Sequence, residues 1–166
     1  MNAQELAERL MGLFRSKGLK PTHMLDMRQM NSSLLSKLNP KERDLLATAI
    51  ENLVDRQFVE VSEWMNQTSL VLTQAGYDYA YPLDEEETIT RIGQSILRQF
   101  EKAQARAGHG LPLRMLDGNL FDKLNPKERG LVPTAIQRLV EEGLMIEREG
   151  SLSVLVLTEA GYDKLY

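Results

Sequence analysis

The chain has 166 residues, of which 42% are hydrophobic and 27% charged, and its formal net charge is −4. This composition is typical of a folded globular protein and is too apolar for an intrinsically disordered one. No apolar stretch approaches the roughly 18 residues that cross a bilayer, and the N-terminus carries acids where a signal peptide carries bases. We therefore expect a cytoplasmic protein without a membrane segment. The sequence contains no cysteine, which excludes disulfides and cysteine-ligated zinc.

The chain contains an internal duplication. The heptapeptide KLNPKER occupies residues 37–43 and recurs at 123–129, 86 positions later. Towards the end of each copy, VLTQAGYDYAY (71–81) matches VLTEAGYDKLY (156–166) at an offset of 85, so one residue has been lost in between. The repeat predicts two domains and a short linker, at 1–81, 87–166 and 82–86.

Each copy is predicted to begin with an amphipathic helix. Apolar residues recur at helical spacing in 3–17 and again in about 86–107, where Ala103 is expected to end the apolar stripe. A loop that contains glycine and proline follows in both copies. A shorter helical segment is then expected to end near Leu38 and near Leu124.

The repeated Asn-Pro-Lys-Glu sequence predicts the start of a third, central helix. Asn39 and Asn125 can cap free backbone N–H groups, proline suits the first helical position, and glutamate stands where a capping box requires it. In the first copy one continuous apolar stripe is expected to face the core, formed by Leu45, Leu46, Ala49, Ile50, Leu53 and Val54.

The second copy differs in this helix. Gly130 and Pro133 stand where the first copy has Asp44 and Ala47. A proline inside a helix removes a hydrogen bond, so we expect a kink or break near Arg129 to Pro133 in the second copy.

Two strands and a short helix are predicted to complete each copy. FVEVSE and SLVLT surround WMNQT in the first copy, and LMIERE and LSVLVL flank Gly150-Ser151 in the second. The lost residue falls in this region, which supports a hairpin because chain length changes most easily at a loop tip. The closing helices begin at Thr73 and Thr158, and their tyrosines are expected to pack on the core.

This order of elements predicts an α+β, mainly α fold of two tandem winged-helix domains, each with three helices, a β-hairpin wing and a short C-terminal helix. TAIQRLVEEGLMIEREG (134–150) and LTEAGYDKL (157–165) resemble the recognition helix, wing and closing Leu-Thr-x-x-Gly motif of MarR-type and PadR-type bacterial regulators. TAIENLVDRQFVEV and LTQAGYDYA show the same pattern in the first copy. The resemblance implies a fold that serves either DNA binding or protein binding. Because those families build dimers from one winged helix per chain, the symmetry here is interpreted as internal, and the oligomeric state stays open.

The charge on the expected reading face distinguishes these two functions. In a winged helix the outward face of the third helix enters the major groove. In the first copy this face presents Asp44, Glu51 and Asp55, which would meet phosphates. The second copy presents a more suitable set of candidate DNA contacts: Lys127, Thr134, Gln137, Arg138 and, in the wing, Arg148.

A second difference between the copies concerns the wing tip. Trp64 and Met65 are expected at the tip of the first wing, where the second copy has a charged tight turn. An exposed tryptophan is a favoured anchor for protein contacts, but Trp64 could equally fold back on its own domain. We expect a macromolecule-binding module with a protein partner, and the alternative is a DNA-binding regulator that reads DNA mainly through the second copy.

No catalytic site is predicted. The only histidines, His23 and His109, occupy equivalent positions, but a metal site needs three or four ligands and their neighbours differ. Glycine-rich phosphate loops and the HExxH and GxSxG motifs are absent. We therefore expect no enzyme activity, cofactor, metal ion or small-molecule ligand, and attribute the two histidines to inheritance through the duplication.

Overall fold

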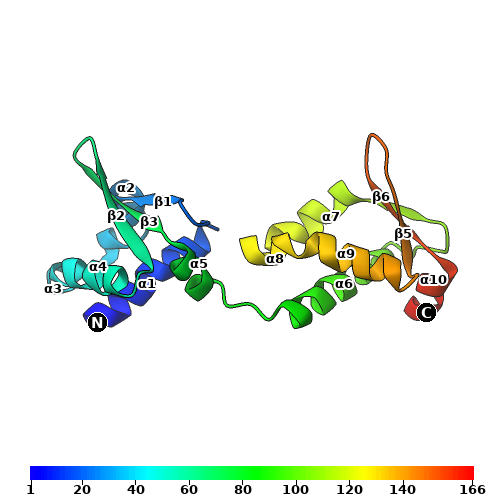
Figure 1. Cartoon of the computed structure of the whole chain (residues 1–166), viewed down its shortest axis with the longest axis horizontal. Helices are drawn as coiled ribbons and strands as arrows, with labels where there is room; N and C mark the ends of the chain where they lie inside the picture. The colour runs from blue at the N-terminus through cyan, green and yellow to red at the C-terminus, as the bar shows by residue number, and fades with distance from the viewer. The chain divides into compact units, whose positions relative to one another are not determined.

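A computed structural model describes residues 1–166 and divides the chain into two compact units, Met1–Pro82 and Leu83–Tyr166 (Figure 1). Helix accounts for 58% of the chain and strand for 16%, so the fold class is α+β and mainly helical, as predicted. Each unit contains one three-stranded antiparallel sheet. None of the helices combines the length and apolarity needed to span a bilayer.

The two units share one order of elements. The first contains α1 (Ala3–Ser16), β1 (Met24–Asp26), α2 (Met27–Ser33), η1 (Leu35–Lys37), α3 (Pro40–Asp44), α4 (Leu46–Asp55), β2 (Val59–Trp64), β3 (Gln67–Leu72) and α5 (Gln74–Ala80). The second contains α6 (Glu85–Lys102), β4 (Gly110–Pro112), α7 (Leu113–Asn119), η2 (Phe121–Lys123), α8 (Pro126–Gly130), α9 (Val132–Glu141), β5 (Met145–Arg148), β6 (Val154–Leu157) and α10 (Glu159–Leu165).

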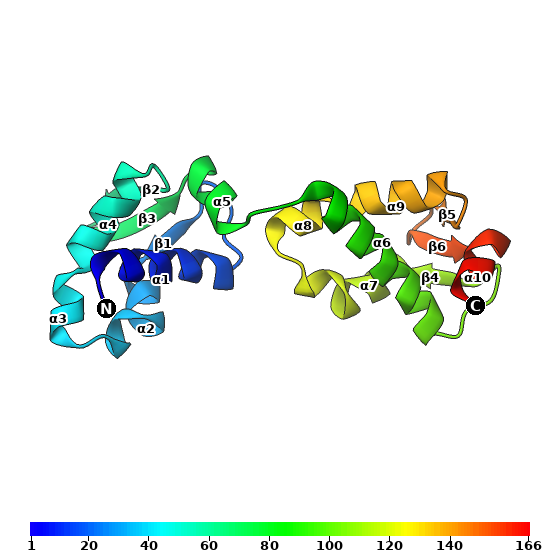
Figure 2. The ribbon, with the colours of Figure 1, turned by 90° about the horizontal axis from the view of Figure 1, so that it is seen from below.

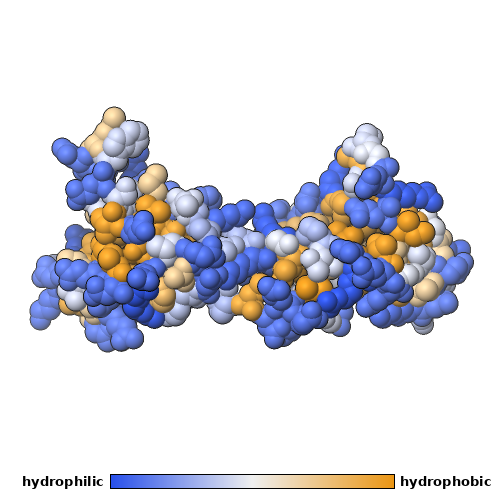
Figure 3. Space-filling model, in the orientation of Figure 1, coloured by the Kyte–Doolittle hydropathy of each residue, from blue (hydrophilic) through white to orange (hydrophobic).

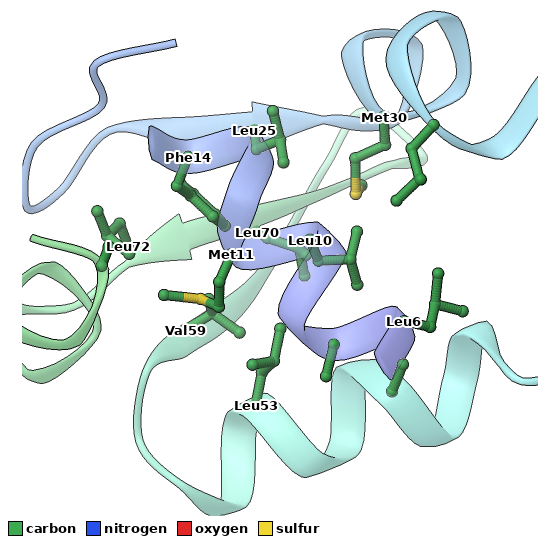
Figure 4. Packing of buried hydrophobic residues seen from close by; sticks show 14 of the residues in the cluster. Leu6, Leu10, Met11, Phe14, Leu25, Met30, Leu53, Val59, Leu70 and Leu72 are labelled. Atoms are coloured by element: carbon green, nitrogen blue, oxygen red, sulfur yellow. The ribbon is translucent and has the colours of Figure 1, made fainter. Parts of the chain in front are cut away.

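The first helix of each unit covers one face of the sheet and supplies the centre of the core. In Figure 4 the side chains of Leu6, Leu10, Met11 and Phe14 point from α1 towards α4 and the strands, and all four are fully buried. Helix α6 packs in the same way against α9 and its sheet (Figure 2). The apolar stripes read from the sequence therefore face the core.

The second unit's first helix is shorter than expected. It begins at Glu85, because the Asp84 side chain accepts a hydrogen bond from the Glu87 N–H, so part of the expected linker 82–86 is helical. It ends at Lys102, and Ala103, which is expected to end the apolar stripe, is the exposed C-cap residue. Gln104 has a φ of 49°, which terminates the helix, and Ala105 is buried in place of Ala103.

Each sheet has a third strand that the sequence pattern did not predict. The strand order is β1-β3-β2 in the first unit and β4-β6-β5 in the second. Strand β1 pairs with β3 through Leu25 and Leu70, and β4 pairs with β6 through Leu111 and Leu155. Three residues are too few to show an alternating pattern, so the sequence predicts a loop where each of these strands lies.

The equivalent histidines have a structural role at the entrance to these third strands. The Nδ1 atom of His23 accepts a hydrogen bond from the Lys20 N–H at 3.2 Å, and that of His109 accepts from the Arg106 N–H at 3.1 Å. The backbone of each histidine also pairs with the last strand of its sheet. Each side chain thus closes the turn that leads from the first helix into the sheet.

The central helix is broken in both units. The predicted capping boxes of Asn39 and Asn125 are present. The expected break in the second unit is confirmed at Leu131, but the continuous helix expected in the first is wrong, because α3 and α4 are separated at Leu45. Proline is therefore not the cause. Pro133 lies in the first turn of α9, where a missing N–H is tolerated.

The last residue of the predicted apolar stripe lies outside the core. Ala49 and Leu53 are fully buried, whereas Val54 is 39% exposed, which contradicts its expected core position.

The tight hairpin turn lies in the first unit, whereas the sequence predicts it in the second. The first hairpin has the tight turn: Trp64 pairs with Gln67, and only Met65 and Asn66 connect the strands, both with positive φ. This is the geometry of a type I′ turn. In the second hairpin Arg148 pairs with Val154, and the loop 149–153 joins the strands. The predicted charged tight turn in the second copy is therefore wrong.

Close packing explains the Leu-Thr-x-x-Gly motif. The Thr73 hydroxyl accepts a hydrogen bond from the Gly76 N–H at 3.0 Å and donates to the Gln57 carbonyl oxygen at 2.5 Å. A Cβ atom at Gly76 would lie 1.9 Å from the Phe58 carbonyl oxygen. In the second unit a Cβ atom at Gly161 would lie 2.0 Å from the Leu144 carbonyl oxygen. Only glycine lets the closing helix lie against the start of the hairpin.

Replacing Gly76 by alanine is expected to destabilise the first unit by about 2 kcal/mol or more, because the new methyl group must displace a backbone carbonyl. The matched control is Gly12→Ala in α1. A Cβ atom there meets nothing within 4 Å, so helix propensity should stabilise the unit by about 0.5 to 1 kcal/mol. Urea unfolding measures both variants. Equal stability of the two variants would contradict the packing role of Gly76.

Candidate functional site

The expected reading face of the first unit is acidic and open to solvent. Asp44, Glu51 and Asp55 are all exposed, as predicted, and none of them forms an ion pair. Since the helix is broken, Asp44 lies on α3 and the other two lie on α4. Three exposed, unpaired carboxylates therefore lie on the two helices that replace the expected reading helix.

Two of the candidate DNA-contacting side chains in the second unit are already hydrogen-bonded to other residues of that unit. Arg138 donates two hydrogen bonds to the Glu86 carboxylate, at 3.0 and 3.1 Å. The Gln137 side-chain amide donates to Glu141 at 2.9 Å. The ion pair between Arg138 and Glu86 raises the pKa of Arg138 and lowers the pKa of Glu86, in both cases mainly through the hydrogen bonds that join the two side chains. Arg138 therefore already has an acidic partner on its own unit.

Among the remaining DNA candidates, Arg148 is the one basic side chain without a partner. Thr134 and Arg148 are exposed, and Lys127 is half-buried and already interacts with another residue. They come from α9, β5 and α8 respectively. The other arginines of this region are paired as well: Arg91 with Glu128, and Arg129 with Asp122 at 3.7 Å.

The tip of the first hairpin exposes two large apolar side chains. Trp64 is 75% exposed and Met65 is 80% exposed, so the alternative in which Trp64 folds back on its own domain is wrong. The hairpin tip stands clear of the helices of its unit (Figure 1). Next to Trp64 is a cleft of about 520 Å³ on the outer face of the sheet, lined also by Met24, Leu19, Ser62 and Ser69.

The base of this hairpin is held by a charged and aromatic cluster. The Arg56 guanidinium lies 4.5 Å from the Phe58 ring centroid and 4.9 Å from that of Tyr79. It also pairs with Glu8 at 3.4 Å, and the Tyr79 hydroxyl donates to the same carboxylate oxygen at 2.6 Å. This cluster links α1, the start of the hairpin and α5, which supports the exposed tip on a fixed base.

The second unit has a groove where α7, α9 and the β5–β6 hairpin meet, and sequence reasoning did not identify it. Its volume is about 640 Å³, and its apolar lining includes Leu113, Phe121 and Pro133. Apolar surface is visible between α9 and the hairpin in Figure 3. Three carboxylates border it: Asp117, Asp122 and Glu147.

The arrangement offers no metal centre. No group of three or more histidine or acidic side chains is placed to hold a metal ion, and His23 and His109 serve the turns described above. In comparisons with known proteins, no family model matches the chain, and no curated protein matches it significantly.

The Glu86 carboxyl is expected to titrate below its ordinary pKa of 4.5 in the native chain, and Arg138→Met should return its pKa towards that value. Because the folded-state pKa is lowered, the pair stabilises the folded state above the ordinary pKa and loses that contribution as pH falls through the folded-state pKa. Carboxyl ¹³C NMR titration measures both proteins. Superimposable titration curves would show that Arg138 is free for another partner.

Proposed function

We propose that the chain is a tandem winged-helix module that acts by binding another protein, with Trp64 and Met65 as its principal contacts. The observation that carries this proposal is the exposure of both side chains, 75% and 80%, at the end of a two-stranded projection. Tryptophan is enriched among the residues that dominate binding energy at protein interfaces. Both apolar side chains are exposed to water at the tip, and a bound partner would bury them.

The backbone at the tip supports the same proposal. Met65 has a φ of 48°, in the left-handed region where asparagine and glycine are preferred over other residues. A side chain other than these costs roughly 1 kcal/mol there. Methionine at this position therefore serves neither the turn nor the core, and its adaptable apolar side chain suits contact with a partner.

The winged-helix assignment rests on the order of elements and on the family resemblance. Four α-helices and a short 3-10 helix precede a hairpin and a closing helix in each unit, the third and fourth helices standing where one central helix is expected, and the Leu-Thr-x-x-Gly motif begins each closing helix. Winged helices serve both nucleic acids and proteins, so the function is argued from the surface. Duplex DNA carries one negative charge per about 1.7 Å, and the exposed Asp44, Glu51 and Asp55 oppose such a ligand.

Trp64→Ala is expected to weaken binding of the protein partner by at least about 2 kcal/mol, or about 30-fold, because it removes the central apolar anchor. The measurement is quantitative affinity purification from the cells that make the protein, with the wild-type chain and the variant as bait. Tyr166→Ala is the matched control, since Tyr166 is another exposed aromatic residue, at 64%. Unfolding curves should be the same for all three proteins.

Met65→Asn separates binding from stability. Asparagine tolerates the left-handed conformation, so this variant should unfold at equal or higher urea concentration while its partner is recovered in lower yield. If the partner is recovered equally with wild type, Trp64→Ala and Met65→Asn, the hairpin tip is not the contact.

Random duplex DNA should show no tight binding to the full chain in fluorescence anisotropy at about 50 mM salt, because the exposed acids repel phosphates. Tight binding that weakens steeply between about 50 and 200 mM salt would instead support the DNA-binding regulator. In that case Gln137→Ala combined with Arg138→Ala should weaken binding, and Trp64→Ala should not.

A further inference from the structure

The groove of the second unit combines apolar walls with an acidic border. Leu113 and Phe121 are half-buried, Val132 and Ile136 are buried, and the exposed Pro133 lies on α9. Asp117, Asp122 and Glu147 stand around these side chains, and each is exposed. The volume of about 640 Å³ is within the range of pockets that enclose a bound group.

The charge of this border is only partly balanced. Arg129 also lines the groove and lies 3.7 Å from Asp122. Asp117 and Glu147 have no hydrogen bond or ion pair, and they come from α7 and β5 on different sides of the groove. A ligand that enters the groove therefore meets apolar surface in the middle and uncompensated negative charge at the edge.

The first unit shows that the fold does not require these carboxylates. The positions of Asp117, Asp122 and Glu147 correspond to Asn31, Ser36 and Val61 in the duplicated sequence, so none of the three acids has an acidic counterpart. By contrast, Arg129 corresponds to Arg43, and its Nε atom bonds the Leu124 carbonyl as that of Arg43 bonds Leu38. The hydrogen bond of this arginine therefore occurs in both copies, whereas the acidic border occurs only in the second.

We propose that this groove is a second binding surface, which takes a linear protein segment with one or two large apolar side chains flanked by lysine or arginine. Apolar side chains would fill the space between α7 and α9, and the flanking bases would face Asp117 and Glu147. This site lies in a different unit from Trp64, so it goes beyond the proposed function and is tested separately.

Charge also distinguishes this occupant from others. DNA would bring phosphates to the acidic border. The hairpin tip of a second copy would bring Glu60 and Glu63 beside Trp64, and like charges oppose that contact. A basic segment with an apolar centre satisfies both features of the groove.

The test begins with a phage-displayed library of random peptides selected on the full chain. Selected peptides are expected to combine large apolar residues with lysine or arginine, and one of them, labelled with fluorescein, becomes the probe for anisotropy. Its affinity should fall about tenfold in the double variant Asp117→Asn, Glu147→Gln, which keeps side-chain size and removes two charges.

A second variant tests the groove itself. Pro133→Arg places a positive charge among the apolar walls and should abolish probe binding, while the core stays intact because Pro133 is exposed. Ala47→Arg, at the equivalent position of the first unit, is the matched control and should bind like wild type. Trp64→Ala should also bind like wild type, which separates this site from the hairpin tip.

Several results would overturn the inference. These are the selection of acidic or neutral peptides or of none, unchanged affinity in the Asp117→Asn, Glu147→Gln variant, and equal effects of Pro133→Arg and Ala47→Arg. Self-association of the free chain that Pro133→Arg abolishes in sedimentation would assign the groove to a second copy. Competition of the probe by duplex DNA would assign it to nucleic acid.

Discussion

The burial of one helix stripe in a small core is the constraint on which each unit depends. Leu6, Leu10, Met11 and Phe14 are all fully buried between α4 and the sheet, and α6 provides the equivalent stripe in the second unit. Units of about 80 residues bury a smaller share of their surface than larger domains do, so each apolar side chain counts. Because Trp64 and Met65 are exposed, their apolar surface does not contribute to the stability of a unit that has little apolar surface to spare.

Features set by local chemistry could be predicted from the sequence. The capping boxes at Asn39 and Asn125 form because asparagine, proline and glutamate satisfy the first N–H groups without help from the rest of the chain. The hairpins could be predicted from their strand patterns, and the residue that the second copy has lost falls in the same region. The break at Leu131 was predicted from Pro133, but the same break at Leu45, where the first unit has Ala47 in place of that proline, shows that the proline is not required for it.

Features that depend on several elements could not be predicted. The exposure of Trp64 follows from the strand register, which pairs it with Gln67 and leaves Met65 in the turn. Strand β1 is stabilised by its pairing with β3 and has no pattern of its own. The groove draws Asp117, Pro133 and Glu147 from three elements that are distant in sequence, so only the folded chain brings them together.

The close approach at Gly76 and Gly161 gives the Leu-Thr-x-x-Gly motif a structural cause. Both glycines are dictated by a carbonyl oxygen that occupies the space of a side chain. Any protein that docks a terminal helix onto the root of such a hairpin would meet this requirement, whatever ligand it recognises. The motif is therefore an architectural solution, and it places no requirement on the identity of the ligand.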